Sequence, residues 1–219
     1  LLRFNEFLGA LPAGVQLFSL FHANPGLLDL VAVVMGNAPR LAEWLSRHPI
    51  LLDAVLSQGF FDPLPARERL SADLDRVLDQ ARDFQDTLEL VRRWNNDRTF
   101  QVGTHILRGR ATPDSAGATI SDLAETCLTA LLPRVEREFA EAHGRIPSGG
   151  MAVVALGKLG GREMTIGSDL DLMFIYDSAG GETSDGPRPL TPPHYFARLS
   201  QRFINAVTAP TGEGKLHEV

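Results

Sequence analysis

Two aspartates stand two residues apart in the stretch Ser168-Asp169-Leu170-Asp171. If this stretch opens a β-strand, its side chains alternate, so that Asp169 and Asp171 share one face and Leu170 takes the other. Carboxylates placed together repel each other unless water, hydrogen-bond donors or a cation offset the repulsion. Magnesium does this well, because it takes one or two protein carboxylates and completes its octahedron with water and phosphate oxygens. Two solvated acids at an exposed strand end are the alternative, and the spacing alone leaves both interpretations open.

A glycine-rich run, Gly157-Lys158-Leu159-Gly160-Gly161, precedes the two aspartates. Glycines let the backbone approach a ligand closely, and free N–H groups there can receive phosphate oxygens. The run has neither the spacing of a Walker loop nor that of a dinucleotide-binding fingerprint. Phosphate contacts from Gly157, Lys158 and Ser168 are therefore one interpretation. A tight turn, a surface lysine and a serine that caps a turn are the other.

Strand-like and helical segments surround these residues. The order is a buried strand at 152–156, a second strand at 170–176, a helix whose apolar stripe runs from Tyr195 to Val207, and the start of a third strand at 216–219. This order predicts a small sheet backed by a helix. The glycine run lies at the end of the first strand, and the aspartates lie at the head of the second.

The residues before this segment follow a helical period from Leu1 to about Gly144. The break Asn24-Pro25-Gly26 ends one helix and starts another, and Pro39 and Pro49 each suit the first turn of a further helix. The polar stretch 92–98 is interpreted as a solvated helix face. Because composition changes at 146–150, we predict an all-helical domain at 1–148 and a second domain at 149–219.

Composition excludes several classes of protein. The net charge of −6 and the pI near 5.5 give no attraction to a phosphate backbone, so we expect no nucleic-acid partner. The most apolar segment, 15–35, is interrupted by polar residues, so we expect no membrane partner. The single cysteine, Cys127, lies in an apolar helical stripe and is predicted to be a small buried residue, which favours a reducing, cytoplasmic setting. The six histidines form no recognised metal spacing and are interpreted as solvated or core-edge residues.

Several stretches resemble the glutamine synthetase adenylyltransferase family. The run 155–164, followed by 167–172, is similar to that family's signature. Further similarity lies in the segments 197–202 and 214–219, which resemble the family's following helix and third strand, and in the segments 23–25 and 47–53, which resemble the helical region before its C-terminal catalytic unit. The chain is therefore interpreted as a fragment of that C-terminal adenylyltransferase unit.

This resemblance implies a fold, an activity and partners. The fold would be α+β and mainly α, with the helical domain followed by a truncated DNA-polymerase-β-like nucleotidyltransferase α/β domain. The activity would be Mg²⁺-dependent transfer of AMP from ATP to a tyrosine of glutamine synthetase, which regulates nitrogen assimilation, with the PII signal protein as a second partner. Asp169 and Asp171 would be the catalytic metal ligands, and Gly157, Lys158 and Ser168 would contact the nucleotide.

The sequence departs from the family pattern at its end. The family's third metal-site aspartate follows a Glu-Val pair, which here is Glu218-Val219, the last two residues. His217 also stands where a tyrosine is expected. We therefore expect weak magnesium binding and weak or absent transfer by this chain alone. Two alternatives remain, namely the deadenylylating, phosphorolytic unit of the same family and a catalytically silent binding module.

Overall fold

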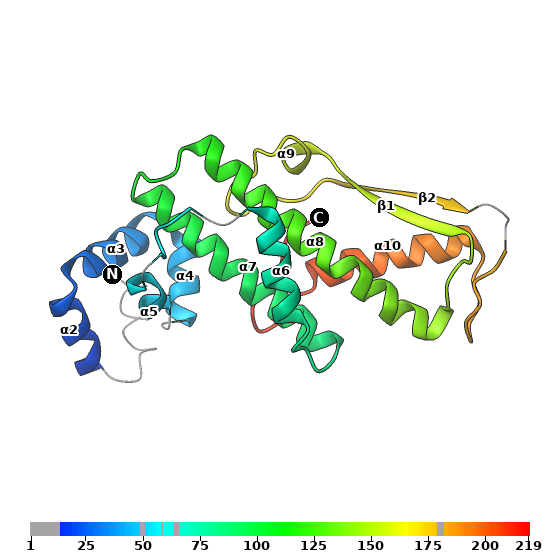
Figure 1. Ribbon diagram of the computed structural model, residues 1–219, viewed down its shortest axis with the longest axis horizontal. Coiled ribbons are helices and arrows are strands. Elements are labelled where there is room, and N and C mark those ends of the chain that lie inside the picture. The colour runs from blue at the N-terminus through cyan, green and yellow to red at the C-terminus, as the bar shows by residue number, and fades with distance from the viewer. Residues whose placement is uncertain (1–13, 49–50, 58, 64–65, 179–181) are drawn as a thin grey trace. The chain divides into compact units, whose positions relative to one another are not determined.

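A computed structural model describes residues 14–48, 51–57, 59–63, 66–178 and 182–219 of the chain. The protein is mainly helical with one two-stranded antiparallel sheet, which confirms the predicted α+β, mainly α class (Figure 1). The helices are α2 (Gly14–Ala23), α3 (Pro25–Asn37), α4 (Pro39–Arg47), α5 (Leu51–Leu56), α6 (Arg67–Leu78), α7 (Phe84–Leu107), α8 (Pro113–His143), α9 (Gly157–Gly160) and α10 (Pro192–Thr208). The strands are β1 (Gly149–Ala155) and β2 (Leu172–Ser178).

Prolines mark the starts of several helices. Pro25, Pro39 and Pro192 occupy the first turns of α3, α4 and α10. Proline suits this position because its missing N–H would have had no partner in the helix. The helix starts expected at Pro25 and Pro39 are confirmed, whereas the one expected at Pro49 lies outside the described residues. No described helix is both long enough and apolar enough to cross a lipid bilayer.

The chain forms two compact units. The first compact unit contains the described residues of the stretch 1–64 together with residues 96–116, and the second contains those of the stretch 65–95 together with residues 117–219. Two of the three boundaries fall within helices, because α7 and α8 each contribute residues to both units. The division of the sequence into domains at residue 149 stays a prediction.

The core of the first compact unit forms around α3, α4 and the second half of α7. Its buried apolar side chains include Leu27, Leu30, Val31, Val34, Ala42, Leu45 and Phe100. Two polar side chains of α7 tie other segments to this core. Gln101 donates from Nε2 to the Phe60 carbonyl oxygen at 2.6 Å, and Asp97 accepts at Oδ1 from the Trp44 indole nitrogen at 3.2 Å.

The sheet of the second compact unit is covered on one face by α10 (Figure 1). Phe174 of β2 contacts Phe203 with ring centroids 6.1 Å apart, and Tyr176 stacks on Phe196 at 4.7 Å. On the opposite face Met173 and Ile175 are 43% and 51% exposed. The expectation of a buried first strand is therefore wrong, because only one face of the sheet is covered and Ala152 of β1 is exposed.

The polar middle of α7 also differs from expectation. Its first arginine, Arg92, is completely buried, so the interpretation of this stretch as a solvated face is wrong there. The guanidinium of Arg92 donates to the carbonyl oxygens of Leu88, Ala206, Ala209 and Gly214 at 2.7–3.0 Å. Burial lowers the pKa of Arg92 to about 10, so it stays charged at neutral pH. A cation suits this place, because the last carbonyls of α10 lack partners within the helix and carry its negative end.

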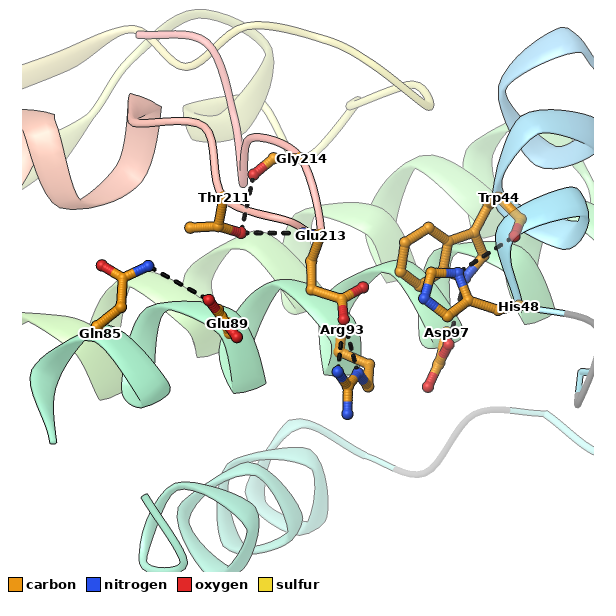
Figure 2. Close-up of polar contacts among 9 residues, drawn as sticks. All are labelled: Trp44, His48, Gln85, Glu89, Arg93, Asp97, Thr211, Glu213 and Gly214. Atoms are coloured by element: carbon orange, nitrogen blue, oxygen red, sulfur yellow. Dashed lines mark hydrogen bonds and ion pairs between the residues drawn. The ribbon is translucent and has the colours of Figure 1, made fainter. Parts of the chain in front are cut away.

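The neighbouring Arg93 bonds the turn that follows α10. Figure 2 shows its guanidinium against the Glu213 carboxylate, with Nε–Oε1 and Nη2–Oε1 distances of 3.0 and 2.5 Å. The chain then continues to Leu216 and His217, whose N–H groups donate to the Val207 carbonyl oxygen at 3.2 and 3.4 Å. No strand forms at 216–219 in the described structure, contrary to expectation, because one backbone bond alone, Leu170 N–H to Glu218 O at 2.8 Å, joins this segment to the residues before β2.

Candidate functional site

The glycine run lies at the end of β1, where it forms the single helical turn α9. Gly157 has a φ of 51°, in the left-handed region that favours glycine. A Cβ at Gly157 would collide with the carboxylate of Asp171, and a Cβ at Gly160 would come within 2.7 Å of the Ala155 carbonyl oxygen. The two glycines are thus needed for close packing, and the structure brings the glycine run and Asp171 together.

The two aspartates lie directly before β2, which begins at Leu172 rather than at Leu170. The predicted alternation holds, since Leu170 is 2% exposed whereas Asp169 and Asp171 are both exposed. Neither carboxylate makes a hydrogen bond or an ion pair with another described residue. The backbone N–H of Leu156 donates to the Asp171 carbonyl oxygen at 2.8 Å, which fixes this stretch to the end of β1.

Ser168 and Lys158 have different surroundings. The Ser168 hydroxyl is buried, accepts the Thr165 N–H at 3.0 Å and shares a hydrogen bond with the Thr165 hydroxyl at 2.9 Å, so Ser168 does cap a turn. Lys158 is exposed and makes no ion pair with another described residue. The phosphate contacts expected of Gly157, Lys158 and Ser168 stay predictions.

An arginine at the end of the glycine run holds it against α8. Arg162 has a φ of 57°, which is unusual for a residue with a side chain. Its guanidinium donates to Asp122 at 2.8 Å and to Glu125 at 3.5 Å, and the hydrogen bond with Asp122 raises its pKa. Glu125 also pairs with Arg67 of α6 at 2.6 Å. This positioning role was not predicted from the sequence, because nothing in the local pattern links Arg162 to acids about forty residues earlier.

His217 lies against the stretch that carries the aspartates. Its ring is hydrogen-bonded to the backbone of Ser168, and its Nε2 is buried without a hydrogen-bond partner in the described part of the chain. Burial lowers the pKa of His217 to about 4, against the smaller opposing effect of the Ser168 bond. The ring is therefore neutral at physiological pH, and the interpretation as a core-edge residue fits His217.

The donor set of the site suits a hard divalent cation. Asp169 and Asp171 offer only carboxylate oxygens, which Mg²⁺ prefers, and neither carboxylate is engaged elsewhere among the described residues. Across the described ranges no group of three or more His, Cys, Asp or Glu side chains could hold a metal ion. The chemistry of these two carboxylates fits a magnesium ion with water or phosphate oxygens in its other positions, and their joint binding of one ion stays a prediction.

A family model and several individual proteins that match this chain carry similar descriptions. Residues 28–219 match the family described as glutamate-ammonia ligase adenylyltransferase. The chain is also similar to proteins named bifunctional glutamine synthetase adenylyltransferase/adenylyl-removing enzyme, with 46% identity in Mesorhizobium japonicum, 44% in Brucella melitensis and 42% in Rhizobium meliloti. Each match covers 100% of this chain and 22% of the relative, so the chain spans about a fifth of the length of these relatives.

Proposed function

The chain belongs to the glutamate-ammonia ligase adenylyltransferase family, and we propose that it forms part of the adenylylating centre of an enzyme that acts on glutamine synthetase. In this proposal the second compact unit is part of a nucleotidyltransferase domain. The observation that carries the proposal is the contact between Gly157 and the Asp171 carboxylate, next to a second carboxylate, Asp169, that no other described residue pairs. A glycine-rich turn next to carboxylates that bind no other described residue suits a phosphate chain and its counter-ion.

The proposed reaction is in-line attack by a tyrosine oxygen of glutamine synthetase on the α-phosphorus of ATP. The tyrosine hydroxyl gives up its proton to solvent and its oxygen bonds to the α-phosphorus. The bond from the α-phosphorus to the oxygen that bridges it to the β-phosphorus breaks, and pyrophosphate leaves. Asp169 and Asp171 would hold magnesium, which would supply neutralisation of the phosphate charge in the transition state.

The remaining residues position rather than react. Gly157 lets the Asp171 carboxylate approach the backbone. The N–H groups of Gly157, Lys158 and Leu159 beside it have no backbone acceptor among the described residues and can receive phosphate oxygens. The exposed Lys158 ammonium attracts phosphate oxygens, and Ser168 maintains the turn that presents Asp169. A third carboxylate, a PII-dependent regulation and a cytoplasmic location belong to this proposal as expectations from the family resemblance.

The experiment follows transfer of labelled AMP from ATP to glutamine synthetase by the longer parent protein. Asp169→Asn and Asp171→Asn should each lower kcat at least about a hundredfold, because each removes a ligand that acts in the transition state. Asp177→Asn is the matched control, since Asp177 is an exposed acid of β2. It should leave the rate within about twofold.

Two results would contradict the proposal. If both Asp169→Asn and Asp171→Asn still transfer AMP at the unchanged rate, these aspartates are not the catalytic metal ligands. Release of ADP from adenylylated glutamine synthetase and phosphate, lost with Asp169→Asn while AMP transfer persists, would instead assign these carboxylates to the adenylyl-removing reaction that the relatives' names also contain.

A further inference from the structure

A cavity of about 470 Å³ lies in the first compact unit, which does not contain the glycine run. It opens between the first turn of α3, the last turn of α5 and residues that follow α5 and α7. Its apolar wall includes Leu27, Leu30 and Val55, which are buried, and Phe61, which is partly exposed. This volume falls within the range of about 300–1,000 Å³ that is usual for small-molecule sites.

Two arginines give the cavity a polar wall. Arg108 donates from Nη2 to the Gly26 carbonyl oxygen at 2.5 Å, which places its guanidinium against the first turn of α3. The guanidinium carbon of Arg110 lies 5.1 Å from the centroid of the Phe61 ring. Arg110 makes no ion pair with another described residue, and Arg108 uses few of its five N–H donors. Both guanidinium groups therefore retain donors for a ligand.

The charge of the cavity wall selects the kind of ligand. No aspartate or glutamate is among the described residues that line the cavity, so the charges of Arg108 and Arg110 are not balanced there. The amino-terminal end of α3 adds a partial positive charge on the same side. An uncharged apolar ligand would make no ion pair with the two arginines, and a small inorganic anion would not cover the apolar side chains. A ligand with an anionic group joined to an apolar body would do both.

We propose that this cavity binds a small-molecule carboxylate with an apolar body. The carboxylate accepts hydrogen bonds from Arg108 and Arg110, and the apolar body lies against Leu27, Leu30 and Val55. A carboxylate matches the planar fork of a guanidinium better than other common anions of this size. This site is separate from Asp169 and Asp171 in the chain and does not depend on the function proposed for them.

The test titrates the chain with 4-phenylbutyrate and follows methyl resonances of Leu27, Leu30 and Val55 by NMR. 4-Phenylbutan-1-ol carries the same apolar body without the charge, and acetate carries the charge without the body. We expect 4-phenylbutyrate to shift these methyl groups with an affinity at least about tenfold above that of either partial ligand, since charge-assisted hydrogen bonds and apolar burial both contribute.

Matched variants distinguish the effect of the two cavity arginines from the effect of losing any one positive charge. Arg110→Gln and Arg108→Gln should each weaken 4-phenylbutyrate about threefold to tenfold and leave 4-phenylbutan-1-ol unchanged. Arg40→Gln is the control, because Arg40 is an exposed arginine of α4 that does not line the cavity. The proposal is wrong if 4-phenylbutyrate does not bind, if the alcohol or acetate binds equally well, or if Arg40→Gln weakens binding as much as Arg110→Gln does.

Discussion

Within one compact unit, the charged group of Arg92 and those of Asp169 and Asp171 differ in burial and in their number of hydrogen-bond partners. Arg92 is completely buried, and carbonyl oxygens from α7, α10 and the turn after α10 accept its donors. The two aspartates are exposed and make no hydrogen bond or ion pair with other described residues. A buried charge with a full set of partners contributes to the architecture, whereas exposed charges without partners remain available to a ligand.

The first prediction removes the buried charge. Arg92→Met should lower the free energy of unfolding by about 3–5 kcal/mol, because it leaves several buried carbonyl oxygens without donors. Arg76→Gln is the control in the same compact unit and breaks an ion pair with Asp73 in which the arginine is 74% and the aspartate 29% exposed, so it should cost about 1 kcal/mol or less. Urea unfolding followed by tryptophan fluorescence measures both. Equal losses for the two variants would contradict the distinction between them.

The second prediction concerns the pH dependence of stability that the titration of His217 causes. His217 is bonded through its backbone to Val207 and through its ring to Ser168. Its pKa is about 4 in the fold, whereas the pKa of a histidine in water is 6.5, so the unfolded chain binds the proton more readily between these values. Stability contributed by the neutral ring is therefore present above pH 6.5 and is lost as the pH falls toward 4.

The size of this loss should be about 3 kcal/mol. His217→Phe removes the titration, so the difference in unfolding free energy between the chain and this variant should change by that amount from pH 7.5 to pH 4. Burial raises the pKa of Glu136, so Glu136 also makes stability depend on pH. Subtracting the unfolding free energy of the variant cancels this contribution. A difference that does not vary with pH would show that the His217 ring titrates alike in both states.

The third prediction tests the contact that carries the proposed function. Gly157→Ala should destabilise the chain by about 1–3 kcal/mol and displace Asp171, because the new Cβ meets its carboxylate at a positive φ. Gly150→Ala is the matched control, since its Cβ would meet no atom within 4 Å. Its effect should stay within about 0.5 kcal/mol. Amide chemical shifts of residues near Asp171 should move only in the first variant.

The smallest effect on stability is expected where the charges are free. Asp169→Asn and Asp171→Asn should each change the unfolding free energy by less than about 0.5 kcal/mol, because neither carboxylate stabilises another described group. Both should nevertheless weaken binding of Mn²⁺, used as a paramagnetic substitute for Mg²⁺ and followed by electron paramagnetic resonance. A large stability loss would indicate that these carboxylates have a structural role.

The structure could be predicted from the sequence wherever it depends on the spacing of nearby apolar residues or on a proline that starts a helix. Helix starts at Pro25 and Pro39, the mainly helical class and the alternation around Leu170 all follow from neighbours in the chain. The buried Cys127 was also predicted correctly. These features depend on residues a few positions apart.

Features that depend on distant partners were missed. Arg92 looks like any helix-surface arginine in its own stretch, and the carbonyl oxygens of α10 and the following turn that bury it lie more than a hundred residues away. The same holds for Arg162, whose partners Asp122 and Glu125 lie on α8. For the candidate site, the sequence identified the glycine run and the aspartates, but only the structure shows that Gly157 and Asp171 are in contact.

The set of bonds around Arg92 also has a consequence for motion. Opening the end of α10 would strip several acceptors from one buried cation at once, so the residues from Ala206 to Gly214 should open together rather than one at a time. The N–H groups of Leu216 and Leu170 depend on the same arrangement, through the carbonyl oxygens of Val207 and Glu218. Hydrogen exchange at these two amides should therefore report a common opening, and the stretch that carries the aspartates would lose its bond to Glu218 whenever the segment after α10 detaches.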